Sequence, residues 1–227
     1  MIELPSPMPP QISGLPRDER GYPVPAENHW VEGAPLLAKQ DRRRFATLLT
    51  SWRCAICGCK FTPSEVLYRL FANDEARHTE QIGGLVRTDG PAHHACAVFS
   101  AMVCPFFATP RARHSSARSA RGDRAAIMGF RTVLTDADFN NVGGLDHLSF
   151  HYSDLADTEW FESPAQLGGL LARAVRRQAR IDVDDRMYWT TSEDLLPDFK
   201  NARKILKALK PTTTSPPVSG KNFWARP

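Results

Sequence analysis

Two short motifs of cysteine and histidine constrain the fold of this chain more than any other feature. The first is Cys54-Ala-Ile-Cys57, followed directly by Gly58, and the second is His93-His94-Ala-Cys96. Two cysteines separated by two residues, with a glycine after the second, are typical of a zinc knuckle. The tight turn aims backbone N–H groups at the thiolates, and glycine adopts the positive φ that such a turn needs. The first motif therefore predicts one half of a metal site.

The second motif supplies the other half if it begins a helix. Asp89-Gly90-Pro91 stands just before it, and this pattern is typical of a helix N-terminus. On a helix, His93 and Cys96 share one face of the first turn, where the helix dipole favours an anionic zinc–thiolate cluster. We therefore predict one zinc ion held by three cysteines and one histidine: Cys54, Cys57, His93 and Cys96.

Four protein ligands fill a tetrahedral zinc ion and leave no position for water, so we expect the zinc to be structural rather than catalytic. Two exchanges in the ligand set stay open: Cys59 in place of Cys57, and His94 in place of His93. Cys104 lies eight residues after Cys96, too far along the same helix to share the ion. We expect Cys104 to be a small buried hydrophobic residue.

The residues between the motifs complete the predicted metal module. Residues 65–71 and 81–87 have the composition of strands, and the Asn-Asp-Glu run at 73–75 is typical of a turn. A knuckle, a hairpin and a helix that carries the last two ligands form the treble-clef arrangement. We therefore expect a helix followed by a treble-clef-like zinc module over residues 36–107.

A proline-rich segment precedes this module. Residues 1–35 contain eight of the 18 prolines, which excludes a regular helix or a central strand, so we expect an extended arm laid on the surface. Its apolar anchors would be Ile12, Leu15, Tyr22, Val24 and Trp30. Pro35 suits the first position of a helix, and apolar residues at helical spacing predict that helix over residues 35–52.

The second half of the chain predicts a smaller α+β region. Residues 108–125 are rich in arginine and serine and are expected to form a linker. Residues 126–210 would hold strands at 127–134, 147–152 and 158–161, a helix that starts at Ser163-Pro164, and a helix over 198–209. Residues 211–227 are expected to form a flexible tail. The fold class is therefore α+β: a treble-clef-like zinc module plus a small antiparallel sheet with helices.

Several functional classes are excluded or made less favourable. No run of about 18 apolar residues occurs, so no membrane span is expected. The N-terminus lacks the basic and apolar regions of a signal peptide, and five cysteines do not suit a disulfide scaffold, so we expect a cytoplasmic protein. The chain also lacks a nucleophile elbow, a phosphate-binding loop and a dinucleotide-binding loop.

Charge is distributed in blocks although the net charge is only +4. Residues 111–131 carry six arginines and one acid, residues 132–169 carry seven acids and no base, and residues 199–227 carry seven bases and no acid. A nucleic-acid-binding protein usually presents one dominant basic face. The mixture therefore favours solvated surfaces and leaves nucleic acid as a second partner class.

Four features occur together in a recognisable combination. They are the phrase Leu15-Pro-Arg-Asp-Glu-Arg-Gly-Tyr-Pro-Val-Pro25, the Cys54-x2-Cys57-Gly motif, the His93-x2-Cys96-Ala motif and Cys104-Pro. In this combination, over about residues 12–110, the chain resembles a family of uncharacterised zinc-binding proteins found in bacteria, phages and prophages. The resemblance implies a small cytoplasmic zinc-binding protein, with phage biology as one context, and it implies no activity.

These observations predict a zinc-stabilised, non-enzymatic binding or adaptor protein whose partner is a protein or a nucleic acid. The proline-rich arm and the aromatic pair Phe223-Trp224 would contact that partner, so deletion of residues 1–30 or 211–227 is expected to impair association while the zinc content survives. The alternative is a metal-dependent nuclease of the HNH type, which uses a similar frame. His78 and His94 would then serve as general base and as a ligand of a second, catalytic metal.

Overall fold

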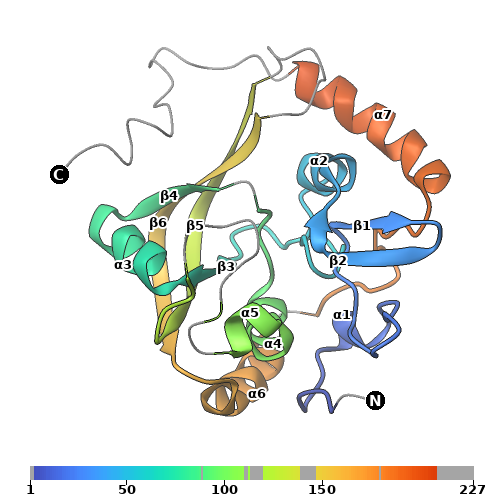
Figure 1. Cartoon of the computed structure of the whole chain (residues 1–227). Helices are drawn as coiled ribbons and strands as arrows, with labels where there is room; N and C mark the ends of the chain where they lie inside the picture. Colours follow the sequence, from blue (N-terminus) through green and yellow to red (C-terminus); the bar gives the residue numbers. More distant parts are fainter. Residues whose placement is uncertain are drawn as a thin grey trace.

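The computed structural model describes residues 3–87, 89–109, 112, 120–138, 147–178 and 180–208. Within these residues the fold is mixed α+β with two antiparallel sheets, which confirms the predicted fold class. Figure 1 shows the larger sheet on one side of the molecule, and α2, α7 and a small β-hairpin on the other. The expected tail at 211–227 and half of the expected linker, at 110–111 and 113–119, lie outside the described residues.

The larger sheet has four strands in the order β3-β5-β6-β4. Its centre is the long antiparallel pair of β5 (Ala125–Asp138) and β6 (His147–Phe161). The sequence predicted both strands, but the two segments expected at 147–152 and 158–161 are parts of the single strand β6. The edges are β3 (Leu67–Ala72) and β4 (Gly84–Arg87).

The prediction of a hairpin between the two Cys/His motifs is wrong. Residues 73–75 begin the helix α3 (Asn73–Ile82) instead of forming a turn, and β3 and β4 lie at opposite edges of the sheet. Asp74 and Glu75 stabilise the first turn through the helix dipole, and Gly83 ends the helix in the left-handed conformation at φ 72°. The knuckle and the following helix are present, but this topology does not confirm the treble-clef assignment.

The helix predicted over 35–52 is shorter and follows a strand. The hairpin of β1 (Asn28–Val31) and β2 (Ala34–Gln40) occupies its expected first turns, and α2 (Arg42–Thr50) comes next. Asp41 sets the start of α2, because its side chain accepts hydrogen bonds from the backbone N–H groups of Arg43 and Arg44.

The proline-rich arm is bound to the rest of the molecule. It contains the single turn α1 (Pro10–Ser13), and Ile12, Leu15 and Val24 are buried as predicted. The backbone N–H of Ala26 donates to the carbonyl of Ile56, which fastens the end of the arm beside the knuckle. One cluster of buried side chains runs from Ile12 through the sheet to Leu206.

The remaining helices surround the sheet and the hairpin. α4 (His94–Val103) and α5 (Pro105–Ala108) follow the second motif. The 3-10 turn Pro164–Leu167 begins with the capping box of Ser163 and Gln166 and leads into α6 (Gly168–Arg177), which packs on α4. α7 (Ser192–Ala208) begins six residues before the predicted start and packs on α2. None of the described helices is long and apolar enough to cross a membrane.

Candidate metal centre and adjoining pocket

The fold brings the four predicted ligands into one buried cluster. The ligand atoms of Cys54, Cys57, His93 and Cys96 all lie within 4.8 Å of one another. The Nδ1 atom of His93 lies 3.4 Å from the Cys57 sulfur and 4.0 Å from the Cys96 sulfur. Ligand atoms of tetrahedral zinc are separated by about 3–4 Å, given metal–ligand bonds of about 2.0–2.3 Å. The donor set and its spacing therefore suit a divalent metal.

The knuckle places the first two cysteines through backbone hydrogen bonds. The N–H of Cys57 points at the Cys54 sulfur at 3.5 Å, and the N–H of Gly58 donates to the Cys54 carbonyl at 2.9 Å. Gly58 has φ 73°, and a Cβ atom there would lie 2.0 Å from the Met187 carbonyl oxygen. Glycine is therefore required both by the turn and by the chain that crosses it.

The start of α4 places the other two ligands. His93 is the N-cap residue and Cys96 lies in the first turn, as the i and i+3 spacing predicted. The Nε2 atom of His93 lies 3.2 Å from the Lys60 carbonyl. A hydrogen bond from Nε2–H to this carbonyl fixes the tautomer that leaves Nδ1 free to bind a metal.

The four side chains of the cluster shift one another's pKa values. Burial opposes ionisation of Cys54, but hydrogen bonds with Cys57 and Cys96 and the charge of His93 outweigh it and hold the pKa of that thiol well below its usual value. Burial also opposes protonation of His93, but the Cys54 thiolate raises the His93 pKa well above its usual range. Burial raises the pKa of Cys57 and of Cys96. Without a metal, these directions favour a Cys54 thiolate paired with a protonated His93, beside the neutral thiols of Cys57 and Cys96. A bound dication would replace the protons on His93, Cys57 and Cys96.

The residues left open as alternative ligands lie outside this cluster. Cys59 is buried with its sulfur 3.8 Å from the Cys57 carbonyl. Its pKa falls to about 7, because of the Cys57 hydrogen bond first and Arg186 second. His94 groups with Asp157 and Glu159 instead. Cys104 is only partly buried, contrary to expectation, because it ends α4 at the wall of a pocket.

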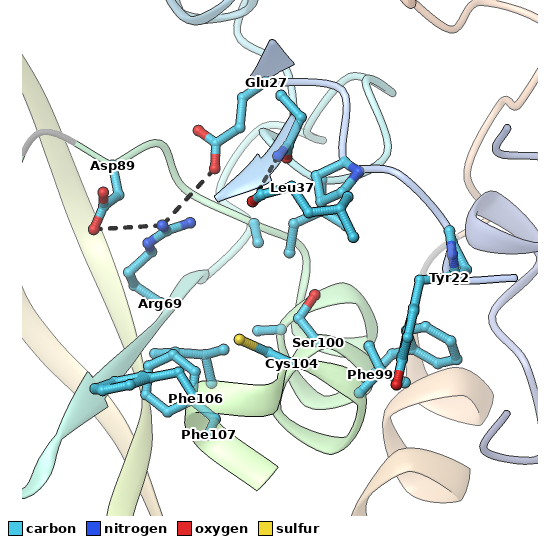
Figure 2. A pocket seen from close by; sticks show the side chains of 18 of the residues that line it. Tyr22, Glu27, Leu37, Arg69, Asp89, Phe99, Ser100, Cys104, Phe106 and Phe107 are labelled. Carbon is cyan, nitrogen blue, oxygen red and sulfur yellow. Dashed lines mark hydrogen bonds and ion pairs between the residues drawn. The ribbon is translucent and has the colours of Figure 1, made fainter. Parts of the chain in front are cut away.

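That pocket has a volume of about 710 Å³ and lies between the arm, β3 and the helices α4 and α5. Figure 2 shows its apolar wall, where aromatic and aliphatic side chains face the cavity: Tyr22, Leu37, Phe99, Phe106 and Phe107. Ser100 and Cys104 of α4 line the same space. Cavities of this size and apolar character are typical of binding sites.

A partly buried ionic cluster lines another part of the pocket wall (Figure 2). The Arg69 guanidinium lies 3.4 Å from Asp89 and 3.9 Å from Glu27, and it donates to the Gly90 carbonyl at 2.8 Å. Burial raises the Glu27 pKa to about 7 against the opposing effect of Arg69. Two carboxyl groups thus share one guanidinium, and burial favours the protonated form of one of them.

Sequence reasoning missed this ionic cluster. Glu27, Arg69 and Asp89 come from the arm, from β3 and from the loop before α4, and no spacing rule links them. In the sequence, Asp89 stands out only as part of a helix-start signal.

The chain matches no protein-family model, no curated protein and no solved structure.

Proposed function

We propose that this protein is a zinc-stabilised, non-enzymatic binding protein of the cytoplasm that receives a segment of a partner protein in the pocket beside its metal centre. The observation that carries the proposal is that two features of the structure lie next to each other. One is a fully buried four-ligand cluster, and the other is a large pocket with an apolar wall and an ionic wall.

The donor chemistry supports zinc as the metal. Three thiolates and one imidazole in a buried tetrahedral set suit zinc better than the hard cations calcium or magnesium. Cys54, Cys57, His93 and Cys96 would hold the ion, and the metal would supply folding free energy. Because all four positions would be protein ligands, chemistry at this ion has no place for water or substrate.

The walls of the pocket indicate the chemistry of the partner segment. Partly buried aromatic side chains such as Phe106 and Tyr22 offer contact area to an aliphatic or aromatic side chain. At the ionic wall, the carboxylates of Glu27 and Asp89 lie together, and the negative charge of such a pair would attract a lysine or arginine of the partner. We therefore expect a partner segment with an apolar residue beside a basic one.

Nucleic acid is less favoured as the partner. Of the three consecutive arginines at 42–44, Arg44 is buried and donates to the Trp189 carbonyl, and Arg43 is paired with Asp41. Both guanidinium groups therefore make bonds within the protein that a phosphate would have to displace.

The first experiment tests the metal. Purified protein is expected to contain about one zinc per chain, and Cys54→Ser or Cys96→Ser should lose the zinc and unfold at a lower temperature, because metal-binding energy is folding energy here. Cys104→Ser is the matched control, since Cys104 lies outside the cluster. A metal-free Cys54→Ser protein with normal stability would contradict the structural role.

The second experiment tests the pocket. Ser100→Trp places a large ring in the cavity, and Asn201→Trp places the same ring on the exposed face of α7 as a control. A random peptide library selected on the zinc-loaded protein is expected to yield segments with an apolar residue beside Lys or Arg. These peptides should bind the Asn201→Trp variant and not the Ser100→Trp variant. Peptides that bind both variants equally would exclude the pocket as the site.

A further inference from the structure

A second cluster of potential ligands lies beside the metal centre. The ligand atoms of His94, Asp157 and Glu159 approach to within 4.8 Å of one another, and all three side chains are partly buried. His94 begins α4, directly after the ligand His93, while Asp157 and Glu159 stand two residues apart on β6. Residues two apart on a strand face the same side of a sheet, so both carboxylates are directed at the imidazole.

The neighbouring strand supports this cluster in two ways. The Tyr68 ring stacks on the His94 ring with centroids 4.2 Å apart and an interplanar angle of 15°. The Tyr68 hydroxyl also lies 3.4 Å from a carboxylate oxygen of Asp157, to which it donates. One side chain of β3 therefore orients both the imidazole and one carboxylate, as the outer partners of metal ligands commonly do.

The sheet leaves room for Tyr68 to reach across. In the register of the sheet, Tyr68 pairs with Gly129 and Gly129 pairs with Asp157. A Cβ atom on Gly129 would lie 2.7 Å from the Tyr68 ring. The missing side chain in the central strand thus lets the tyrosine lie over β5 and meet the aspartate on the far strand.

The polar groups of the cluster are incompletely satisfied by the protein. The Nε2 atom of His94 is buried and has no hydrogen-bond partner among the described residues. Among the described residues, no hydrogen bond or ion pair holds the carboxylate of Glu159, although the charge of the exposed Arg173 acts on it. A buried nitrogen without a partner next to two carboxylates is costly unless something else binds there.

We propose that His94, Asp157 and Glu159 form a second metal site, which binds a divalent transition-metal cation with open coordination positions. One imidazole nitrogen and two carboxylates are ligands that suit Mn²⁺ or Fe²⁺, whereas the thiolates of the other centre suit zinc. Three protein ligands leave positions for water or for an anionic group, so this ion, unlike the zinc, has room to bind a further ligand.

The experiment titrates Mn²⁺ into the full chain after the cysteine centre has been loaded with one equivalent of zinc. Electron paramagnetic resonance measures the Mn²⁺ that stays free in solution. Mn²⁺ is the probe because it prefers oxygen and imidazole to thiolate and does not displace the zinc. We expect one Mn²⁺ bound per chain. Asp157→Asn and Glu159→Gln should each weaken binding at least tenfold, and Tyr68→Phe, which keeps the stacked ring, should weaken it about tenfold.

The matched control is Asp154→Asn on the same strand. Asp154 is exposed and pairs with Arg131 at 3.2 Å, and asparagine tolerates its φ of 57°. This variant should bind Mn²⁺ as the unchanged protein does. Zinc content shows that each variant is folded. Absence of Mn²⁺ binding at millimolar concentrations in the zinc-loaded protein would overturn the proposal, as would equal binding by the Asp157→Asn, Glu159→Gln and Asp154→Asn variants.

Discussion

At the scale of single residues, the candidate metal centre depends on a glycine in its knuckle as well as on the four potential ligands. Gly58 closes the knuckle, and its carbonyl accepts a hydrogen bond from the N–H of Met187 at 3.0 Å. The segment around Met187 thereby lies directly against the turn that carries Cys54 and Cys57. The position of the ligands is thus coupled to a segment far away in the sequence.

Gly58→Ala should therefore destabilise the protein strongly. The new Cβ would lie 2.0 Å from a backbone oxygen in a turn with φ 73°, so the backbone must shift, and we expect a loss of about 2–4 kcal/mol in the free energy of unfolding. Gly33→Ala is the control, because Gly33 has φ 80° but a Cβ atom added there would meet no other atom within 4 Å, and only about 1 kcal/mol is expected. Chemical denaturation measures both. Equal losses would show that φ alone, and not the contact with Met187, requires glycine at position 58.

The ionisation of Glu27 is expected to make the stability of the protein depend on pH. Burial raises the folded-state pKa of Glu27 from 4.5 to about 7. Between these values the unfolded chain has lost this proton while the folded protein keeps it, so the contribution of Glu27 to stability falls as pH rises from about 4.5 to 7 and is level above that. Relative to the unchanged protein, Glu27→Gln should gain stability across this range, by up to about 3 kcal/mol at pH 8. Denaturation at several pH values measures the difference, and a difference independent of pH would show that Glu27 ionises normally.

At the scale of secondary-structure elements, the sequence correctly predicted those elements whose formation depends on patterns within a few neighbouring residues. The knuckle, the start of α4, the strands β5 and β6 and the capped start before α6 follow from spacing, caps and alternation within a few residues. The strand β2 and the helix α3 were missed. Pro35 suited a helix start but lies in a strand of a two-stranded hairpin, and Asn73-Asp74-Glu75 suited a turn but begins a helix.

The same distinction holds for the sites. Cys54, Cys57, His93 and Cys96 are recognisable because each pair is local and its side chains have few other uses in such spacing. The ionic cluster of Glu27, Arg69 and Asp89 is formed only when the arm crosses the end of β3, and Asp157 meets His94 only through the packing of α4 on the sheet. Tertiary pairing of common residue types leaves no local pattern.

The helix α2 depends on its N-cap. Asp41 accepts a hydrogen bond from the N–H of Arg43 at 2.9 Å and lies 3.0 Å from the Nδ1 atom of His29 on β1. Asp41→Ala removes both the cap and the ion pair, and we expect a loss of about 2 kcal/mol in the free energy of unfolding. Asp41→Asn keeps an acceptor for the cap and should lose less than half as much. If both variants lose the same amount, the charge of Asp41 and not the cap stabilises this element.

At the scale of the whole molecule, segments distant in sequence converge on the metal centre. The amide of Gln11 in α1 lies 3.4 Å from the Cys96 sulfur and also exchanges hydrogen bonds with Gln178, just after α6. Arg186 donates to the Gln11 carbonyl at 2.7 Å. The proline-rich arm is therefore part of the wall around the proposed zinc ion, and its role extends beyond contact with a partner.

This packing changes what deletion of the arm should do. Ile12 and Leu15 belong to the main core and Gln11 is fully buried against Cys96, so removal of residues 1–30 exposes both the core and a proposed metal ligand. Instead of leaving the zinc content intact, the deletion should lower the melting temperature by at least about 10 °C and speed the transfer of zinc to a chelator. Gln11→Leu in the full chain removes the amide contact with Cys96, together with the hydrogen bonds to Gln178, while the rest of the arm stays in place. It should speed zinc transfer severalfold, because an apolar group replaces a hydrogen-bond donor to Cys96, whereas Ser13→Ala in the same turn should not. Zinc transfer at the unchanged rate in both the deletion and the Gln11→Leu variant would show that the arm only covers the centre and does not stabilise it.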